Sequence, residues 1–288
     1  LAAAKIAAGL QRSIIAGGLD LRSRLARTED SGPWTDDPDL AVLPANFPPV
    51  FSADLQAFLE GRQLSELNEW AALSKNRYRE NDSGSFSYLH AIYDENGLLL
   101  LDKDELAETG NPDAVEPLLS ISDYLYYLPL AQKQLYHLES FDRLHTRFTA
   151  ATEAEGLSFL LLGGETAMDT TPIGKVVSYT LLEGKEGIPF SGMGAAAGKV
   201  LVQAGLQAEK IDLWACDEAF AASVLNFQKL MNIPSEKLNV SGGNLAFGRP
   251  SGANGSLLLV RLLEDLKKRQ LTFGLLTIAD RTGIAAAM

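Results

Sequence analysis

The sequence predicts a layered α/β protein, because short apolar strands alternate with helices throughout its C-terminal half. The predicted strands in this half are residues 158–164, 175–182, 211–216 and 271–279. The predicted helices are residues 193–205, 217–231 and 257–268. The last of these helices is amphipathic and ends in Lys267-Lys268-Arg269, basic residues that complement the helix dipole.

The N-terminal half is less regular. An Ala-rich helical pattern covers residues 3–13, and residues 13–18 predict a short buried strand that ends in a glycine turn. Residues 27–50 carry five prolines and predict a loop, whereas residues 52–80 predict two helices. The second helix places Leu67, Trp70, Ala71 and Ser74 on one face. Residues 86–101 predict a hairpin, with Glu95-Asn96-Gly97 as its turn.

Composition is that of a folded protein without a membrane span. The chain has 288 residues, of which 46% are hydrophobic and 22% are charged. No apolar run approaches the roughly 18 residues that a spanning helix needs. The single cysteine, Cys216, cannot form an internal disulfide, which predicts a reducing compartment such as the cytoplasm.

The charge is concentrated in one segment. Residues 28–120 contain 19 Asp plus Glu and 5 Lys plus Arg, a balance of −14, against −12 for the whole chain. Such a segment repels polyanions, so nucleic acid is not expected as a partner. The field is also poor for a coenzyme A phosphate group, and the preferred interpretation is a solvated acidic surface.

Three short motifs lie near the C-terminus. They are Asp217-Glu218-Ala219-Phe220, Gly248-Arg249-Pro250 and Ala279-Asp280-Arg281. In order and spacing they resemble the NEAF, GHP and Cys-glycine motifs of thiolases, which make or cleave 3-ketoacyl-CoA thioesters. Residues 149–158 similarly resemble the family's TAGN segment, without its asparagine. The resemblance is strong for residues 211–288, moderate for 1–20 and 52–80, and weak for 85–150.

The resemblance implies the layered αβαβα thiolase fold. On this basis residues 1–23 are a remnant of the N-terminal thiolase domain, 24–147 an inserted loop domain, and 148–288 the remainder of the core. The family's nucleophilic cysteine would lie on the order of ten residues before Leu1, so the sequence is expected to lack its N-terminal part. Relatives imply a homo-oligomer, or a heteromer with an active thiolase.

The catalytic positions of the family are altered. Arg249 replaces a histidine, and a guanidinium cannot shuttle a proton near neutral pH. Asp217 replaces an asparagine and brings negative charge where an enolate would form. Ala279 replaces the second cysteine and has no proton to exchange. These changes predict impaired thiolysis and Claisen condensation.

Arg249 and Asp217 are the candidate catalytic positions, with any surviving role electrostatic. Because their two motifs face each other in thiolases, we hypothesise that these residues form a salt bridge in the former catalytic space. Separately, Arg249 could hold a negative oxygen or a carboxylate, and the alternative to that role is an arginine tethered to a nearby acid. The resemblance implies substrate-binding roles for Phe220, Gly248, Ala279 and Met193.

Other reactive residues have plainer interpretations. Cys216 is expected to be a packed small hydrophobe, because neighbouring carboxylates weaken a thiol nucleophile. His90, His137 and His145 show no metal-ligand spacing and are expected at surfaces or interfaces. The glycines of residues 241–256 are a weak phosphate-loop signal, and the resemblance instead implies tight loop packing.

Two functional classes remain open. The first is an acyl-CoA acyltransferase of the thiolase type, with impaired or altered chemistry. The second is a non-catalytic scaffold or regulatory subunit of an active thiolase complex. No metal or separate cofactor is implied, and the expected substrate class is a coenzyme A thioester.

Overall fold

A four-stranded mixed sheet forms the centre of the described structure. The computed structural model describes residues 1–21, 23, 47–81, 90–102, 115–133, 137–165, 167, 171–183, 192–280 and 283–288. The sheet has the order β5-β8-β7-β6. Its strands are β5 (Thr180–Glu183), β6 (Leu213–Cys216), β7 (Gly274–Ala279) and β8 (Ile284–Ala287). Only β6 and β7 are parallel, and the connection between them contains the helices that a parallel crossover requires.

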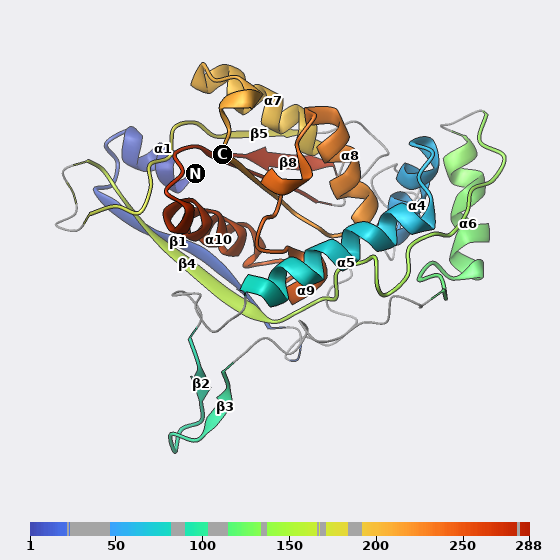
Figure 1. The fold of residues 1–288 in the computed structure, drawn as a ribbon, viewed down its shortest axis with the longest axis horizontal. Coiled ribbons are helices and arrows are strands. Elements are labelled where there is room, and N and C mark those ends of the chain that lie inside the picture. Colours follow the sequence, from blue (N-terminus) through green and yellow to red (C-terminus); the bar gives the residue numbers. More distant parts are fainter. Residues whose placement is uncertain are drawn as a thin grey trace.

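Helices cover both faces of this sheet, as the α/β prediction requires. In Figure 1, α7 (Gly192–Ala204) and α8 (Ala221–Met231) lie on one side and α10 (Asn254–Arg269) on the other. Helix α10 also packs on an antiparallel ribbon of β1 (Ser13–Asp20) and β4 (Gly156–Gly163). Helices, sheet, helix and ribbon therefore follow one another in layers, and the predicted layered α/β class is confirmed.

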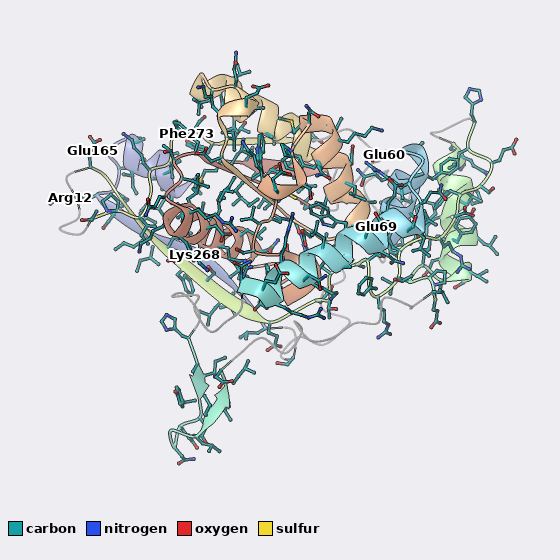
Figure 2. The ribbon with its side chains drawn as sticks, in the orientation of Figure 1. Arg12, Glu60, Glu69, Glu165, Lys268 and Phe273 are labelled. Carbon is teal, nitrogen blue, oxygen red and sulfur yellow. The ribbon has the colours of Figure 1, made fainter. Side chains whose placement is uncertain are left out.

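Two helices of the proline-flanked region pack against the core. Helix α4 (Pro49–Leu59) contacts α8, and α5 (Leu64–Asn81) contacts α8 and the short α9 (Asn244–Phe247). The predicted inner face of α5 is confirmed, because Leu67, Trp70, Ala71 and Ser74 are all buried. Glu69 of α5 and Lys268 of α10 lie on the exposed sides of their helices (Figure 2).

Peripheral elements complete the described chain. They are α1 (Ala2–Ala7), β2 (Ile92–Tyr93), β3 (Leu99–Leu101), α6 (Ile121–Gln132) and the 3-10 helices Ala208–Lys210 and Ser235–Lys237. The β2–β3 hairpin turns at residues 95–97 as predicted, although residues 86–89 lie outside the described range. None of the helices in the described part is long and apolar enough to cross a membrane.

Several predicted boundaries are wrong for identifiable reasons. Helix α1 stops at Ala7, followed by Gly9 with φ +71°, instead of reaching residue 13. Residues 217–220 are not helical, because α8 begins only at Ala221 after an extended Phe220. The hydrogen-bonded part of the predicted strand 175–182 starts at Thr180, where Ala287 provides its partner.

The glycine pair of β1 is not a turn. The strand runs through Gly17 and Gly18 to Asp20, and one of its two faces is exposed instead of buried. A Cβ on Gly18 would lie 1.9 Å from the carbonyl oxygen of Gly252, in the loop before α10. Glycine is therefore required here for close backbone approach.

We predict that Gly18→Ala destabilises the protein by about 1–3 kcal/mol. The added methyl group and the Gly252 carbonyl oxygen are both fixed directly to the backbone, so neither can rotate away. The matched control is Gly198→Ala in α7, where an added Cβ meets nothing within 4 Å. That control is expected to be neutral or to stabilise by about 0.5–1 kcal/mol. Urea unfolding measures both, and equal free energies of unfolding for the two variants would contradict the close-packing explanation.

Candidate functional site

Backbone hydrogen bonds bring the predicted motif segments together. The Ala151 N–H donates to the Ala219 carbonyl at 3.0 Å, and the Ala221 N–H donates to Thr149 at 2.9 Å. The Arg249 N–H donates to Thr152 at 2.8 Å. Residues 149–154 thus lie between the segment that begins at Asp217 and the Gly248-Arg249-Pro250 loop, and they hydrogen-bond to both.

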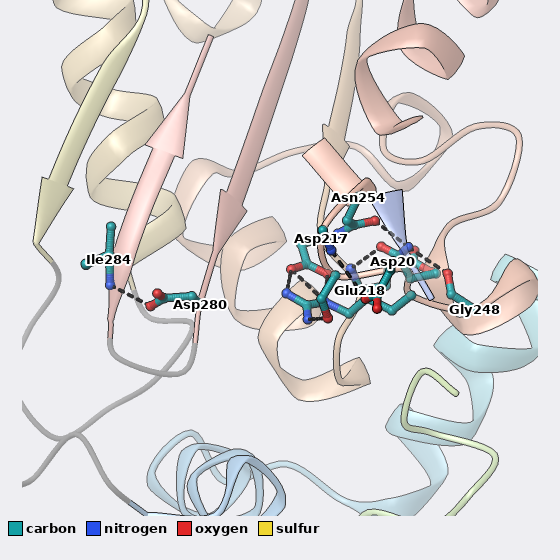
Figure 3. Close-up of polar contacts among 11 residues, drawn as sticks. Asp20, Asp217, Glu218, Gly248, Asn254, Asp280 and Ile284 are labelled. Atoms are coloured by element: carbon teal, nitrogen blue, oxygen red, sulfur yellow. Dashed lines mark hydrogen bonds and ion pairs between the residues drawn. The ribbon is translucent and has the colours of Figure 1, made fainter. Parts of the chain in front are cut away.

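Strand β7 joins the same assembly. The Asp217 N–H donates to the Thr277 carbonyl at 3.1 Å, two residues before Ala279. Ala279 is 4% exposed, so its methyl group is packed in the core. Strand β8 is linked to the end of β7 by the Asp280 carboxylate, which accepts from the Ile284 N–H at 3.0 Å (Figure 3).

Asp217 and Arg249 form the salt bridge that the sequence suggested. Arg249 Nη2 lies 2.7 Å from Asp217 Oδ2, and Nε lies 2.9 Å from Oδ1. This is a bidentate arrangement, the strongest common geometry for these groups. The Asp217 side chain is 1% exposed and that of Arg249 is 23% exposed. Arg249 Nη1 also donates to the Ser251 hydroxyl at 3.0 Å.

Electrostatics keep the guanidinium charged. Burial acts to lower the pKa of Arg249, but the neighbouring carboxylates, Asp217 first among them, together outweigh it, and the pKa lies above its ordinary value. Asp280 and Glu153 act in the same direction as Asp217. Arg249 is therefore a permanent cation among acids, and it has no lone pair with which to accept a proton.

Glu218, the next residue, points into a separate buried network. Its carboxylate accepts from Trp70 Nε1 at 3.2 Å, Ser74 Oγ at 2.7 Å and Asn239 Nδ2 at 2.6 Å. It also accepts from the Leu245 N–H at 3.3 Å. Burial raises the pKa of Glu218, although these hydrogen bonds act in the opposite direction. The network ties α5 and α9 to the motif segment.

The glycine-rich loop packs against this carboxylate. A Cβ on Gly243 would lie 2.2 Å from the Glu218 side chain, so only glycine fits there. The Gly243 N–H donates to Ser74 Oγ at 2.9 Å, which leaves the Ser74 hydroxyl hydrogen for Glu218. Tight packing is thus the role of this glycine, as the resemblance implied. The residue that Gly243 packs against is Glu218, a buried acid. That Trp70 and Ser74 hydrogen-bond to this acid was not predicted from the sequence.

Cys216 is fully buried beside these acids. Burial, and then the Glu218 and Asp217 carboxylates, raise the pKa of the Cys216 thiol well above its ordinary value. Its backbone N–H donates to Asn239 Oδ1 at 2.9 Å. Such a thiol is a poor nucleophile. Among the described residues, no three His, Cys, Asp or Glu side chains gather as a metal site.

The residues predicted to bind substrate are buried. Met193, Phe220 and Ala279 belong to one apolar core cluster, and they are 1%, 9% and 4% exposed. Gly248 adopts φ +85° and its carbonyl accepts from Asn244 Nδ2 at 2.9 Å. Their substrate roles therefore remain predictions.

Arg249 and Ala279 line neither the small cavity at Asn239 nor the larger one at Pro250. The larger, of about 170 Å³, lies between the β2–β3 hairpin and the loop that contains Pro250.

The prediction of surface histidines is right for two of the three and wrong for the third. His90 and His137 are exposed, in agreement with a surface location. His145 is wholly buried, so the expectation of a surface or interface role is wrong for it. Its Nδ1 lies 2.7 Å from the equally buried Asp54 Oδ1. The two residues are 91 positions apart, and no local sequence signal could have paired them.

Comparison with known proteins gives a consistent assignment. Residues 170–288 match the family model "Thiolase, C-terminal domain". The chain is 41% identical over 126 residues to the acetyl-CoA acetyltransferase of Escherichia coli (strain K12), covering 42% of this chain and 31% of that protein. It is 34% identical over 173 residues to a 3-ketoacyl-CoA thiolase of Shewanella amazonensis, covering 51% and 39%. The matched stretches thus span about a third of these relatives.

Solved structures match over more of the chain. The dimeric peroxisomal thiolase of Saccharomyces cerevisiae superposes with a TM-score of 0.81 at 20% identity, covering 99% of this chain and 70% of that one. Human mitochondrial 3-ketoacyl-CoA thiolase gives a TM-score of 0.75 at 22% identity, covering 99% and 73%. At these identities the likeness establishes the fold.

We predict strong coupling between Asp217 and Arg249. Arg249→Gln leaves the buried Asp217 carboxylate without its counterion. The free energy of unfolding should fall by on the order of 2–3 kcal/mol, less than for a fully buried pair because Arg249 is only partly buried. Asp217→Asn combined with Arg249→Gln should cost about 1 kcal/mol, since two amides can hydrogen-bond each other. Denaturant unfolding of the wild type, both single variants and the double variant measures the coupling. Single effects that add to within about 0.5 kcal/mol would show the two side chains to be independent.

Proposed function

Because the chain belongs to the thiolase superfamily, we propose that it is an acyl-CoA acyltransferase-type protein impaired in carbon–carbon bond exchange. The Asp217–Arg249 salt bridge is the single observation that supports the impairment most directly. In the family pattern these positions hold an asparagine and a histidine, and the resemblance assigns the histidine a proton-transfer role. The salt bridge fills both positions with fixed, opposite charges.

The chemistry of the pair supports this proposal. Claisen condensation requires a base that removes a proton next to the thioester carbonyl, and thiolysis requires the reverse transfer. A guanidinium cannot accept that proton, and the Asp217 carboxylate is already engaged through both oxygens by Arg249. The packed methyl group of Ala279 supplies no second acid at the remaining motif position.

A coenzyme A thioester is the proposed ligand class. The relatives that support it carry the names acetyl-CoA acetyltransferase and 3-ketoacyl-CoA thiolase. Phe220, Gly248, Ala279 and Met193 are the positions proposed to contact it by resemblance. No contact through a separate cofactor is proposed.

Assembly and compartment are proposals of the same kind. The yeast relative is described as dimeric, which supports a homo-oligomer, and a heteromer with an active thiolase is the alternative. Relatives carry peroxisomal and mitochondrial names as well as bacterial origins, so the cytoplasmic assignment rests on the lone cysteine.

A non-catalytic scaffold or regulatory subunit is the second candidate function. The observation that favours it is the complete pairing of Asp217 by Arg249, which leaves neither charged group dedicated to a reacting molecule. In this case the thiolase fold would serve for association, and binding of acyl-CoA would be dispensable.

Two measurements on the wild-type protein test these functions. We expect saturable acetoacetyl-CoA binding by calorimetry, displaced by free coenzyme A, with thiolysis no faster than in protein-free buffer. General acid–base catalysis is worth about 10²–10⁴-fold, so its loss is readily detected. The double variant Asp217→Asn/Arg249→Gln, which keeps the site filled, should leave turnover unchanged.

The outcomes separate the candidates. Turnover in the wild type that disappears in the double variant would overturn the proposed impairment and assign Arg249 or Asp217 a catalytic role. Absence of both turnover and saturable binding would instead favour the scaffold function.

A further inference from the structure

Helix α8 begins without a side-chain cap of its own. Its N-cap residue is Phe220, which has no hydrogen-bonding side chain. The first N–H groups of a helix lack intrahelical partners and need acceptors from elsewhere when they are buried. The Ala221 N–H donates to Thr149 at 2.9 Å, and the Ser223 N–H donates to the Phe220 carbonyl at 3.1 Å.

The remaining N–H, that of Ala222, is directed at His145. The Ala222 nitrogen lies 3.5 Å from His145 Nε2, a long hydrogen bond in which the imidazole nitrogen is the acceptor. The ring also packs edge-on against Phe220, with centroids 5.2 Å apart and an interplanar angle of 80°. A histidine 77 residues away therefore takes the place of the N-cap side chain.

The other ring nitrogen is held by Asp54 of α4. Asp54 Oδ1 lies 2.7 Å from His145 Nδ1 and also accepts from the N–H groups of His145, at 2.8 Å, and Leu144, at 3.1 Å. A carboxylate oxygen accepts, so Nδ1 carries the hydrogen and Nε2 keeps its lone pair. The contacts at the two nitrogens thus require the same tautomer, and both side chains are 0% exposed.

We propose that His145, fixed as its Nδ1–H tautomer by Asp54, is a positioning residue that caps α8 and thereby sets the segment that carries Asp217. Asp217 lies four residues before Ala221, and between them Phe220 is extended and the chain at Ala219 is hydrogen-bonded to Ala151. Helix α4 is thus linked to the Asp217–Arg249 salt bridge through one imidazole. This inference concerns the geometry of the salt bridge and does not depend on acyl-CoA binding.

A second polar contact also joins α4 to the start of α8. Ser223 Oγ, in the first turn of α8, donates to Gln56 Oε1 of α4 at 3.2 Å. Helix α4 therefore meets the start of α8 through two polar links, and the Asp54–His145 link is the one that reaches a backbone N–H. Loss of the cap is expected to affect the first turn of α8 before the rest of the helix.

Two substitutions of His145 separate capping from simple occupancy of the space. His145→Gln places an amide oxygen near the former Nε2 and retains an acceptor for Ala222, but it loses the donor to Asp54. His145→Asn places an amide nitrogen near the former Nδ1 and retains the donor to Asp54, but it loses the acceptor. Amide hydrogen exchange followed by NMR reads the Ala222 N–H in both, and the Arg249 Nε–H reports on the salt bridge.

We expect His145→Asn to speed exchange of the Ala222 N–H by roughly tenfold or more over His145→Gln, as for loss of a helix cap. Exchange at the Arg249 Nε–H should rise in parallel, whereas that in the middle of α10 should be equal in the two variants. Equal Ala222 exchange in both variants would overturn the capping role. Faster Ala222 exchange with an unchanged Arg249 signal would overturn the link to the salt bridge.

A measurement on the wild type does not depend on how the variants fold. Nitrogen-15 shifts of the imidazole rings at neutral pH distinguish the two neutral tautomers, and the buried His145 is assigned by its absence from the spectrum of His145→Gln or, if that variant fails to fold, by sequential assignment. A hydrogen on Nδ1 is the expected result. A hydrogen on Nε2 would place a donor against the Ala222 N–H and overturn the proposal.

Discussion

The requirement that a buried carboxylate keep its counterion governs the arrangement of the candidate site. Asp217 is almost inaccessible to solvent, and removing an isolated carboxylate from water is costly unless hydrogen bonds and an opposite charge compensate. Arg249 supplies both through a bidentate contact. The loop at 248–250 pairs with residues 152–154, and residues 149–151 of the same segment pair with the chain around Ala219, which brings Arg249 within reach of Asp217.

The adjacent carboxylates of Asp217 and Glu218 have different partners. The first carboxylate is neutralised by a guanidinium, and the second is satisfied by donors from Trp70, Ser74, Asn239 and Leu245. The two networks contact different elements, so the motif segment is held from both sides. The Asp217–Arg249 pair is thus held in place by neighbouring elements, and its guanidinium has no lone pair with which to accept a proton.

Much of the fold and part of the site could be predicted from the sequence. Helical periodicity located α7, α10 and the inner face of α5, because burial on one face leaves a repeat in the residues. The Asp217–Arg249 contact was foreseeable because both residues stand at motif positions of one family. Strand β8 was missed because Ile284–Ala287 is too short and Ala-rich to carry a strand signal, and α6 because Pro129 lies inside it. The Asp54–His145 pair depends on tertiary packing alone.

The most direct test of a site unable to move protons is exchange of the hydrogens next to the thioester carbonyl. Acetyl-CoA is incubated in D₂O with excess protein, and loss of its methyl proton signal is followed by NMR. If Arg249 and Asp217 neutralise each other and Ala279 contributes nothing, exchange proceeds at the rate of buffer alone. Protein-dependent exchange that saturates with acetyl-CoA and vanishes in the Asp217→Asn/Arg249→Gln variant would contradict the account.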